Sequence, residues 1–453
     1  MSGRGLIYGL EDKPGWGTAV FVGFQHFLAM FASIITPSLV LCRGVGAGAE
    51  TVGVMLSASL LTSGVATWIQ INRLGVVGSG LLSVQGTSSA FIAVMAGMGA
   101  ALLEEGATPE AALGTMLGTS AMCALLEVGL SFVLPLARRV LTPVVAGTVI
   151  LLLGLNLIGI AMAKFAGGAV AAADGSYGSW KHLALGLASM GTVLVCNRLP
   201  WGWCRIGSAL FGILAGMALA AGMGMLAPRV PLEQAVSWPR WLPLELHVAW
   251  AWVAPMLVLY VATTVETIGD ITATSLLSGE PTEGKVYEER LRGGILADGL
   301  NTMGAALFGA FPTTSFSQNN GVIQLTGVAS RRCGLAVAGL LVLCGLSGAV
   351  ARFFMRVPEA VMGGVCLVLF CLVAVAGIRL LAPSLKGTRE VLTVAAGLGA
   401  GLGVVLRPDA LGGLPEWARS LFGSGVVTGT VAVLAAQAIL GRTPAEDGTA
   451  AAS

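Results

Sequence analysis

Five ionisable side chains lie inside strongly apolar segments of this 453-residue chain, and they are its best candidates for chemistry. Glu266 and Asp270 share one segment, Asp298 lies in the next, and His26 and Glu127 lie in two earlier ones. A charged side chain is costly in lipid, so such residues mark substrate or ion pathways by default. The pattern indicates a polar site inside a membrane.

Glu266 and Asp270 are four residues apart, so they share one face of a helix. Two carboxylates that lie close in a low dielectric cannot both ionise cheaply, and one should take up a proton near neutral pH. A proton-coupled carrier needs such a group. The alternative is a solvated helix end, and it suits Asp270 better than Glu266, which lies just past the middle of its segment.

The other three residues are less specific. Asp298 and His26 fit membership of the site and a polar contact between helices equally well. Glu127 has no polar neighbours in its apolar run, which favours a packing or interface role.

Residues 311–327, FPTTSFSQNNGVIQLTG, are polar although they lie between two apolar regions. Irregular polar backbone survives at membrane depth only where protein or a water-filled cavity covers it. Gln318 and Asn319 offer paired donors and acceptors, which can bind the edge of a planar heterocycle. Gly321 permits close backbone approach. We expect this stretch to line a substrate site.

Residues 83–89, SVQGTSS, break a second apolar segment in the same way. Ser88, Ser89 and Phe91 could supply backbone groups, hydroxyls and an aromatic face to the same site. Helix packing through small residues is an equally good explanation of the serines.

The composition predicts the elements that position these residues. The chain is 55% hydrophobic and 11% charged, whereas soluble domains carry about 25% charge. A membrane span needs about 20 apolar residues. We expect fourteen segments, at 17–41, 51–71, 81–101, 111–136, 142–163, 182–195, 206–227, 247–277, 293–310, 312–326, 334–350, 358–377, 391–405 and 425–440. Residues 278–292 are predicted to form the main cytoplasmic loop, with a short amphipathic helix.

Loop charges and segment order predict an orientation and an internal repeat. Most of the 25 Lys and Arg residues fall in cytoplasmic loops if both termini are cytoplasmic, as the positive-inside rule requires. Fourteen segments give seven per half. Because seven is odd, the second half of a duplicated chain would cross the membrane in the opposite orientation to the first. The two broken segments are the third of each half, and such a pair is the best sequence pointer to a transporter's binding site.

Other functions lack support in the sequence. The net charge of +2 gives no hint of a nucleic-acid partner, and the eight Cys form no CxxC pair. No hydrolase, nucleotide-binding or metal-ligand motif is present, so we expect no cofactor, no metal and no enzyme activity. Two alternatives to a proton-coupled carrier stay open: an inorganic-anion exchanger or channel on the same architecture, and a membrane enzyme or receptor without transport.

The signature at residues 318–327, QNNGVIQLTG, resembles that of the nucleobase–ascorbate transporter family, also called nucleobase/cation symporter family 2. Residues 25–26 (QH) resemble the family's first-span motif, and residues 266–274 (ETIGDITAT) and 294–299 (GILADG) resemble its bacterial xanthine and uric acid permease branch. The resemblance runs from about residue 10 to residue 440.

The resemblance implies an all-α polytopic fold of two inverted seven-segment repeats, with short strands in the third and tenth segments. It implies a core domain at 16–136 and 247–351, and a gate domain at 137–230 and 352–441. Residues 1–15 would be a cytoplasmic N-terminal segment and 442–453 a cytoplasmic tail. It also implies a homodimer in the bacterial inner membrane.

For the site, the resemblance implies that Glu266 and Gln318 bind the nucleobase directly. The surrounding polar network would be His26, Asp270, Asp298 and Asn319, with proton coupling within the set His26, Glu266, Asp270 and Asp298. Residues 88–89 would supply backbone contacts. Gln, rather than Glu, at the first signature position favours a purine, and the choice between xanthine and uric acid stays open. The expected function is proton-coupled import of oxidised purines, with the core moving against the gate.

Overall fold

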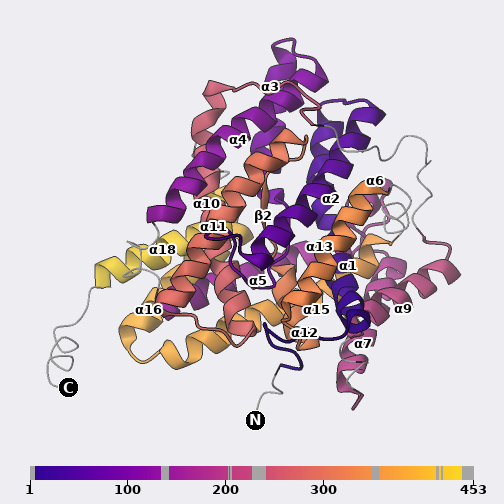
Figure 1. Cartoon of the computed structure of the whole chain (residues 1–453), viewed down its shortest axis with the longest axis vertical. Helices are drawn as coiled ribbons and strands as arrows, with labels where there is room; N and C mark the ends of the chain where they lie inside the picture. The colour runs from indigo at the N-terminus through magenta and orange to yellow at the C-terminus, as the bar shows by residue number, and fades with distance from the viewer. Residues whose placement is uncertain are drawn as a thin grey trace.

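The computed structural model describes residues 6–133, 142–201, 204, 207–226, 241–347, 357–414, 418–419 and 422–440. Over these residues the chain is a polytopic bundle of helices around one short pair of strands (Figure 1). The predicted tail and the expected domain limits near residues 137, 230 and 351 lie outside the described residues.

Each predicted apolar segment overlaps a helix of the structure, while α6 (Gly168–Asp174) has no predicted counterpart. The first half holds α1 (Trp16–Gly44), α2 (Ala49–Asn72), α3 (Ile92–Glu104), α4 (Pro109–Val133), α5 (Pro143–Phe165), α6 (Gly168–Asp174), α7 (Trp180–Arg198) and α9 (Ser208–Gly222). The second half holds α10 (Trp250–Leu277), α11 (Gly284–Leu307), α12 (Gln318–Thr326), α13 (Arg331–Leu346), α15 (Glu359–Leu381), α16 (Thr388–Leu406) and α18 (Gly425–Leu440).

Seven of these helices are long and apolar enough to cross a membrane, namely α1, α2, α4, α5, α10, α15 and α16. Shorter apolar helices cover Val94–Glu104, Ser208–Gly222 and Gly425–Leu440. The protein is therefore a multi-pass membrane protein, while the count of fourteen spans in two repeats stays a prediction.

The loop predicted at residues 278–292 is shorter than expected, because α11 begins at Gly284 and continues without a break to Leu307. Its first turns are rich in Lys, Glu and Arg, which are good helix formers and need no apolar surroundings. Two ion pairs fix this polar start: Glu289 to Arg73 at 2.9 Å, and Arg290 to Glu280 at 2.8 Å. The charged residues before residue 293 lie outside the predicted apolar segment but inside helix α11.

The two broken segments meet in the middle of the bundle. Strand β1 (Gln85–Thr87) pairs antiparallel with β2 (Thr313–Ser315), in the register Gln85–Ser315, Gly86–Thr314 and Thr87–Thr313 (Figure 1). The Ser88 N–H donates to the Pro312 carbonyl at 2.8 Å, and the Phe316 N–H to the Val84 carbonyl at 2.9 Å. The two segments thus satisfy each other's backbone groups, which lipid could not do.

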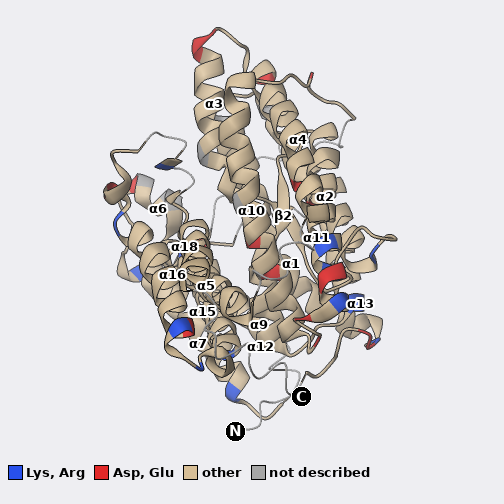
Figure 2. Cartoon of the chain, turned by 90° about the vertical axis from the view of Figure 1, so that its left-hand side faces the viewer, with Lys and Arg blue, Asp and Glu red and all other residues tan. Residues whose placement is uncertain are grey.

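Two groups of helices lie on opposite sides of the molecule, with α3, α4, α10 and α2 on one side and α5, α15, α16 and α7 on the other (Figure 2). Helix α12 touches the second group at Gly321, where a Cβ would lie 2.7 Å from the Leu369 carbonyl oxygen of α15. Figure 2 also shows acidic residues at the α3–α4 loop, and basic and acidic residues together near α11 and α13.

Candidate functional site

Asp270 joins α10 to α12 next to the strand pair. It is 3% exposed, and its Oδ1 accepts a hydrogen bond of 2.6 Å from the Ser317 hydroxyl. Asn320 Nδ2 lies 3.4 Å from the same oxygen, and the Thr274 hydroxyl donates to Asn320 Oδ1 at 2.6 Å. The sequence allowed the interpretation that Asp270 lies at a solvated helix end. The structure places it in a buried network instead. It anchors the start of the signature helix.

Asp298 is fully buried and joins four elements. Its Oδ1 accepts from Gln70 Nε2 at 2.9 Å, and its Oδ2 accepts from the Thr267 hydroxyl at 2.6 Å. The Ser315 hydroxyl of β2 is 3.4 Å from Oδ2. The carboxyl thus ties α2, α10 and α11 to the strand that crosses the site.

Gln70 was not predicted as a site residue. It is fully buried, its Nε2 also donates to the Gly294 carbonyl at 3.0 Å, and its Oε1 accepts from the Ser79 N–H at 2.8 Å. An amide near the end of an apolar span is commonly a helix-end residue, so its position hid this role. The sequence feature that could have identified Gln70 is its polar amide side chain within the apolar segment 51–71.

We expect Gln70→Leu to destabilise the protein by about 2–4 kcal/mol, because it leaves the Ser79 N–H unpaired and removes a donor from a buried carboxyl. The thermal unfolding temperature in detergent measures this loss. Asn72→Ala is the matched control, because the Asn72 amide bonds to Trp68 of its own helix in an exposed position. Equal unfolding temperatures for the two variants would contradict the anchoring role.

Glu266 and Gln318 differ from Asp270 and Asp298, whose side-chain oxygens are hydrogen-bonded within the protein. Both side chains are half-buried, and neither has a hydrogen-bond partner within the described part of the chain. Glu266 lies one turn before Asp270 on α10, and Gln318 follows Ser317, which binds Asp270. The two open polar side chains therefore come from neighbouring helices that the Asp270 contacts hold together.

His26 and Asn319 are buried, and each leaves polar atoms unpaired. Both ring nitrogens of His26 and the Oδ1 of Asn319 lack a geometrically acceptable hydrogen bond among the described residues. The Asn319 side chain lies beside His26, and its Nδ2 donates to the Leu82 carbonyl. Buried polar atoms are nearly always paired, and the adjacent His26 and Asn319 side chains are available partners for each other.

The third-segment residues divide into open and covered groups. Ser89 is exposed, whereas Ser88 is 3% exposed. Phe91 is 1% exposed, and its ring packs against Tyr260 with the ring centroids 4.9 Å apart. The structure therefore places the aromatic face of Phe91 in a helix contact and leaves Ser89 accessible.

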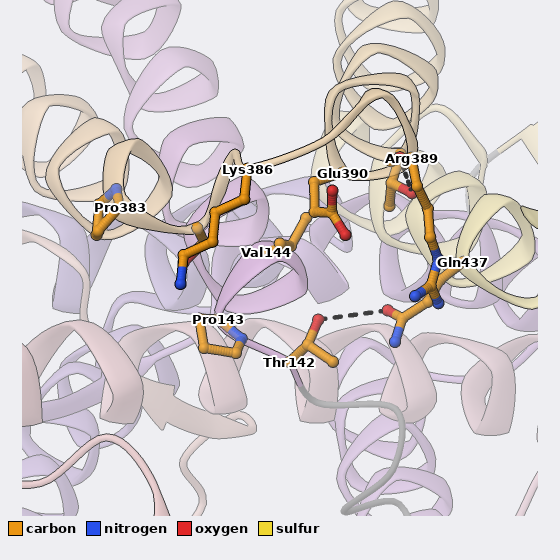
Figure 3. Close-up of a pocket in the computed structure, with 10 residues that line it drawn as sticks. Thr142, Pro143, Val144, Pro383, Lys386, Arg389, Glu390 and Gln437 are labelled. Carbon is orange, nitrogen blue, oxygen red and sulfur yellow. Dashed lines mark hydrogen bonds between the residues drawn. The ribbon is translucent and has the colours of Figure 1, made fainter. Parts of the chain in front are cut away.

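Glu127 is 2% exposed, and its Oε1 lies 3.5 Å from the Thr264 hydroxyl. A cavity of about 280 Å³ lies elsewhere, among the starts of α5 and α16 and the end of α18 (Figure 3). Thr142, Lys386, Glu390 and Gln437 line it, and none of the predicted site residues does. No group of three or more His, Cys, Asp or Glu that could hold a metal occurs among the described residues.

A multi-pass bundle with a polar strand crossing and buried acids is the architecture of a membrane transporter. A model described as a permease family, Xan_ur_permease, matches residues 17–410. The chain belongs to the nucleobase–ascorbate transporter family, in its xanthine and uric acid permease branch.

Known proteins support this membership. The chain is 41% identical to xanthine permease XanP of Escherichia coli over 431 residues, covering 95% of this chain and 93% of that one. It is 38% identical to xanthine permease XanQ of the same organism over 420 residues, covering 91% and 89%. The solved transmembrane domain of the cyanobacterial bicarbonate transporter BicA is similar in fold, with a TM-score of 0.53 at 14% identity, covering 92% and 97%. The relatives are permeases, and this chain is a transporter rather than an enzyme.

Proposed function

We propose that this protein is a secondary active importer of oxidised purine nucleobases, xanthine or uric acid or both, coupled to proton symport. The observation that carries the proposal is the pair Glu266 and Gln318, which are open polar side chains beside a saturated buried network. The names of XanP and XanQ, xanthine permeases, support this substrate class.

The chemistry of the two side chains suits a flat, polar heterocycle. Oxidised purines carry ring N–H donors beside carbonyl acceptors. The Glu266 carboxylate would accept from N–H groups, and the Gln318 amide would pair with a second edge, because it both donates and accepts. Ser88 and Ser89 would add contacts from the residues that follow β1, while Asn319 would hold the strand crossing. A site built to hydrogen-bond a substrate rejects analogues that leave its polar groups unpaired.

Proton coupling would use the acids and the imidazole near the substrate: Glu266, Asp270, Asp298 and His26. Protonation of this set would lower the cost of moving it between the two membrane faces. The proton gradient would be the only coupling agent, with no cofactor.

Movement would follow the division into core (16–136 and 247–351) and gate (137–230 and 352–441). Helix α12 belongs to the core and contacts α15 of the gate at Gly321, so sliding of one domain along the other would carry the site across the membrane. We infer a homodimer in the bacterial inner membrane with both termini cytoplasmic. The basic residues near α11 and α13 support this orientation (Figure 2).

The competing function, an inorganic-anion exchanger or channel, is not favoured. An ionised Glu266 would repel an inorganic anion. The likeness to the bicarbonate transporter BicA is at 14% identity and concerns the fold alone.

We expect cells that lack their own purine permeases to take up labelled xanthine when they produce this protein. Unlabelled uric acid, hypoxanthine, guanine and uracil, each in excess, rank the substrates, and a protonophore tests the coupling. Competition by uric acid but not uracil, and loss of accumulation with the protonophore, are the expected results. Absence of uptake of every nucleobase, or uptake indifferent to the protonophore, would contradict the proposal.

A further inference from the structure

Glu127 is buried in α4 against a neighbouring helix. Its side chain is 2% exposed in the middle of α4, and it interacts electrostatically with the Asp298 carboxyl of α11. The two helices approach closely at this level, since a Cβ on Gly299 would lie 2.8 Å from Val128 Cγ2. Glu127 and Asp298 are here called the rear pair.

Helix α10 carries Glu266 and Asp270, here called the front pair, and Asp270 also interacts electrostatically with Asp298 of the rear pair. Thr264 and Thr267, three residues apart, face the rear pair: the Thr267 hydroxyl donates to Asp298 at 2.6 Å, and the Thr264 hydroxyl lies 3.5 Å from Glu127. The front pair belongs to the face of α10 that meets α12. Helix α10 therefore directs two threonine hydroxyls at the rear pair and carries the front pair itself.

Neither acid of the rear pair has a basic partner among the residues that the structure describes. The ion pairs among the described residues are Arg73–Glu289, His247–Glu245, Arg290–Glu280 and Arg331–Glu11, and none includes either acid. Arg292 of α11 contacts α4 over the Phe132 ring, 4.8 Å from its centroid. The titratable groups that interact with Glu127 itself are Asp298 from α11 and Tyr260 from α10. None of them brings a positive charge, so two carboxylates here would repel each other in a low dielectric unless one held a proton.

The hydrogen bonds identify where that proton fits. Asp298 already accepts from Gln70 and Thr267, so its oxygens act as acceptors. The Thr264 hydroxyl donates a hydrogen bond to the Tyr260 carbonyl at 2.7 Å. Its own oxygen can therefore accept a hydrogen bond from another group. A protonated Glu127 could donate to that oxygen, whereas an ionised Glu127 would find no donor at normal distance.

We propose that the rear pair carries the transported proton, with Glu127 as its proton-holding member. The inference rests on the proposed proton symport and deepens it. One proton binds to the pair as the loaded core moves inward and leaves it on the cytoplasmic side, with no other bond made or broken. Glu266 is then left to bind the purine with Gln318, while Asp270 holds the start of α12.

The test uses the purified full-length protein in vesicles, with labelled xanthine. Uptake driven by an imposed inward proton gradient is compared with counterflow, the exchange of xanthine at equal pH on both sides. The variants are Glu127→Gln, which keeps the shape and cannot exchange a proton, and Glu127→Asp, which can. Glu110→Gln, an exposed acid at the start of the same helix, is the control.

We expect Glu127→Gln to lower gradient-driven accumulation about tenfold or more, as loss of a proton-transfer group commonly does, while counterflow continues. Glu127→Asp should keep measurable accumulation. The infrared C=O band of a protonated carboxyl, which changes when xanthine binds, should disappear in Glu127→Gln. Accumulation in Glu127→Gln at the wild-type level, or loss of counterflow and accumulation together in both variants, would overturn the inference. Counterflow without gradient-driven accumulation in the wild type would instead reject the proposed symport.

Discussion

Glu266→Gln is expected to abolish purine uptake while the protein still reaches the membrane. The substitution keeps the size of the side chain, but it removes the charge and turns an amide N–H towards substrate N–H groups. Charge-assisted hydrogen bonds contribute about 1.5–3 kcal/mol, so the loss should reach about 100-fold. The half-buried position of Glu266, with no partner in the described part of the chain, leaves no protein group to compensate.

Initial rates of labelled xanthine uptake measure this effect, normalised to the amount of protein in the membrane. Glu245→Gln is the matched control, because the Glu245 side chain is 93% exposed in a loop. Wild-type rates in Glu266→Gln would remove Glu266 from the mechanism. A large loss of uptake in Glu245→Gln would show that removing any acidic side chain lowers the rate, whatever its position.

Gly321→Val is expected to cause a comparable loss of transport through a steric effect. A Cβ at this position would lie 2.7 Å from both the Cβ and the carbonyl oxygen of Leu369, so α12 and α15 would have to separate. Overpacking of this kind costs about 1–3 kcal/mol, and here it lies where the core would slide along the gate. Uptake should therefore fall by about tenfold or more, with a smaller effect on the unfolding temperature.

Gly339→Val supplies the control for this variant, because the space around a Cβ on Gly339 of α13 is open. It carries the same helix-propensity change without the contact. If both variants transport at the same rate, the close approach of α12 to α15 has no part in the cycle.

Much of the fold was accessible from the sequence, because apolar length alone predicts a membrane helix. The segments predicted at 17–41 and 51–71 coincide with α1 and α2, and each of the other predicted segments falls on a helix or on a strand followed by a helix. The polar breaks at 83–89 and 311–327 indicated where the backbone would leave the helical pattern, since lipid tolerates such a break only inside protein.

The site was accessible only in part, because hydrogen bonding between distant segments leaves no local pattern. Gln70 and Asp298 are 228 positions apart and bind each other at 2.9 Å. The apolar run around Glu127 favours a packing or interface role, and the acid that interacts with it, Asp298, lies on another helix. Phe91 was expected at the site, and the structure places its ring against Tyr260.

The most direct test of the central claim is an experimental structure of the protein with xanthine bound. We predict the purine beside the crossing of β1 and β2, with ring N–H groups donating to the Glu266 carboxylate and an edge paired with the Gln318 amide. Xanthine in the cavity among α5, α16 and α18 (Figure 3), or xanthine that contacts neither Glu266 nor Gln318, would contradict the account.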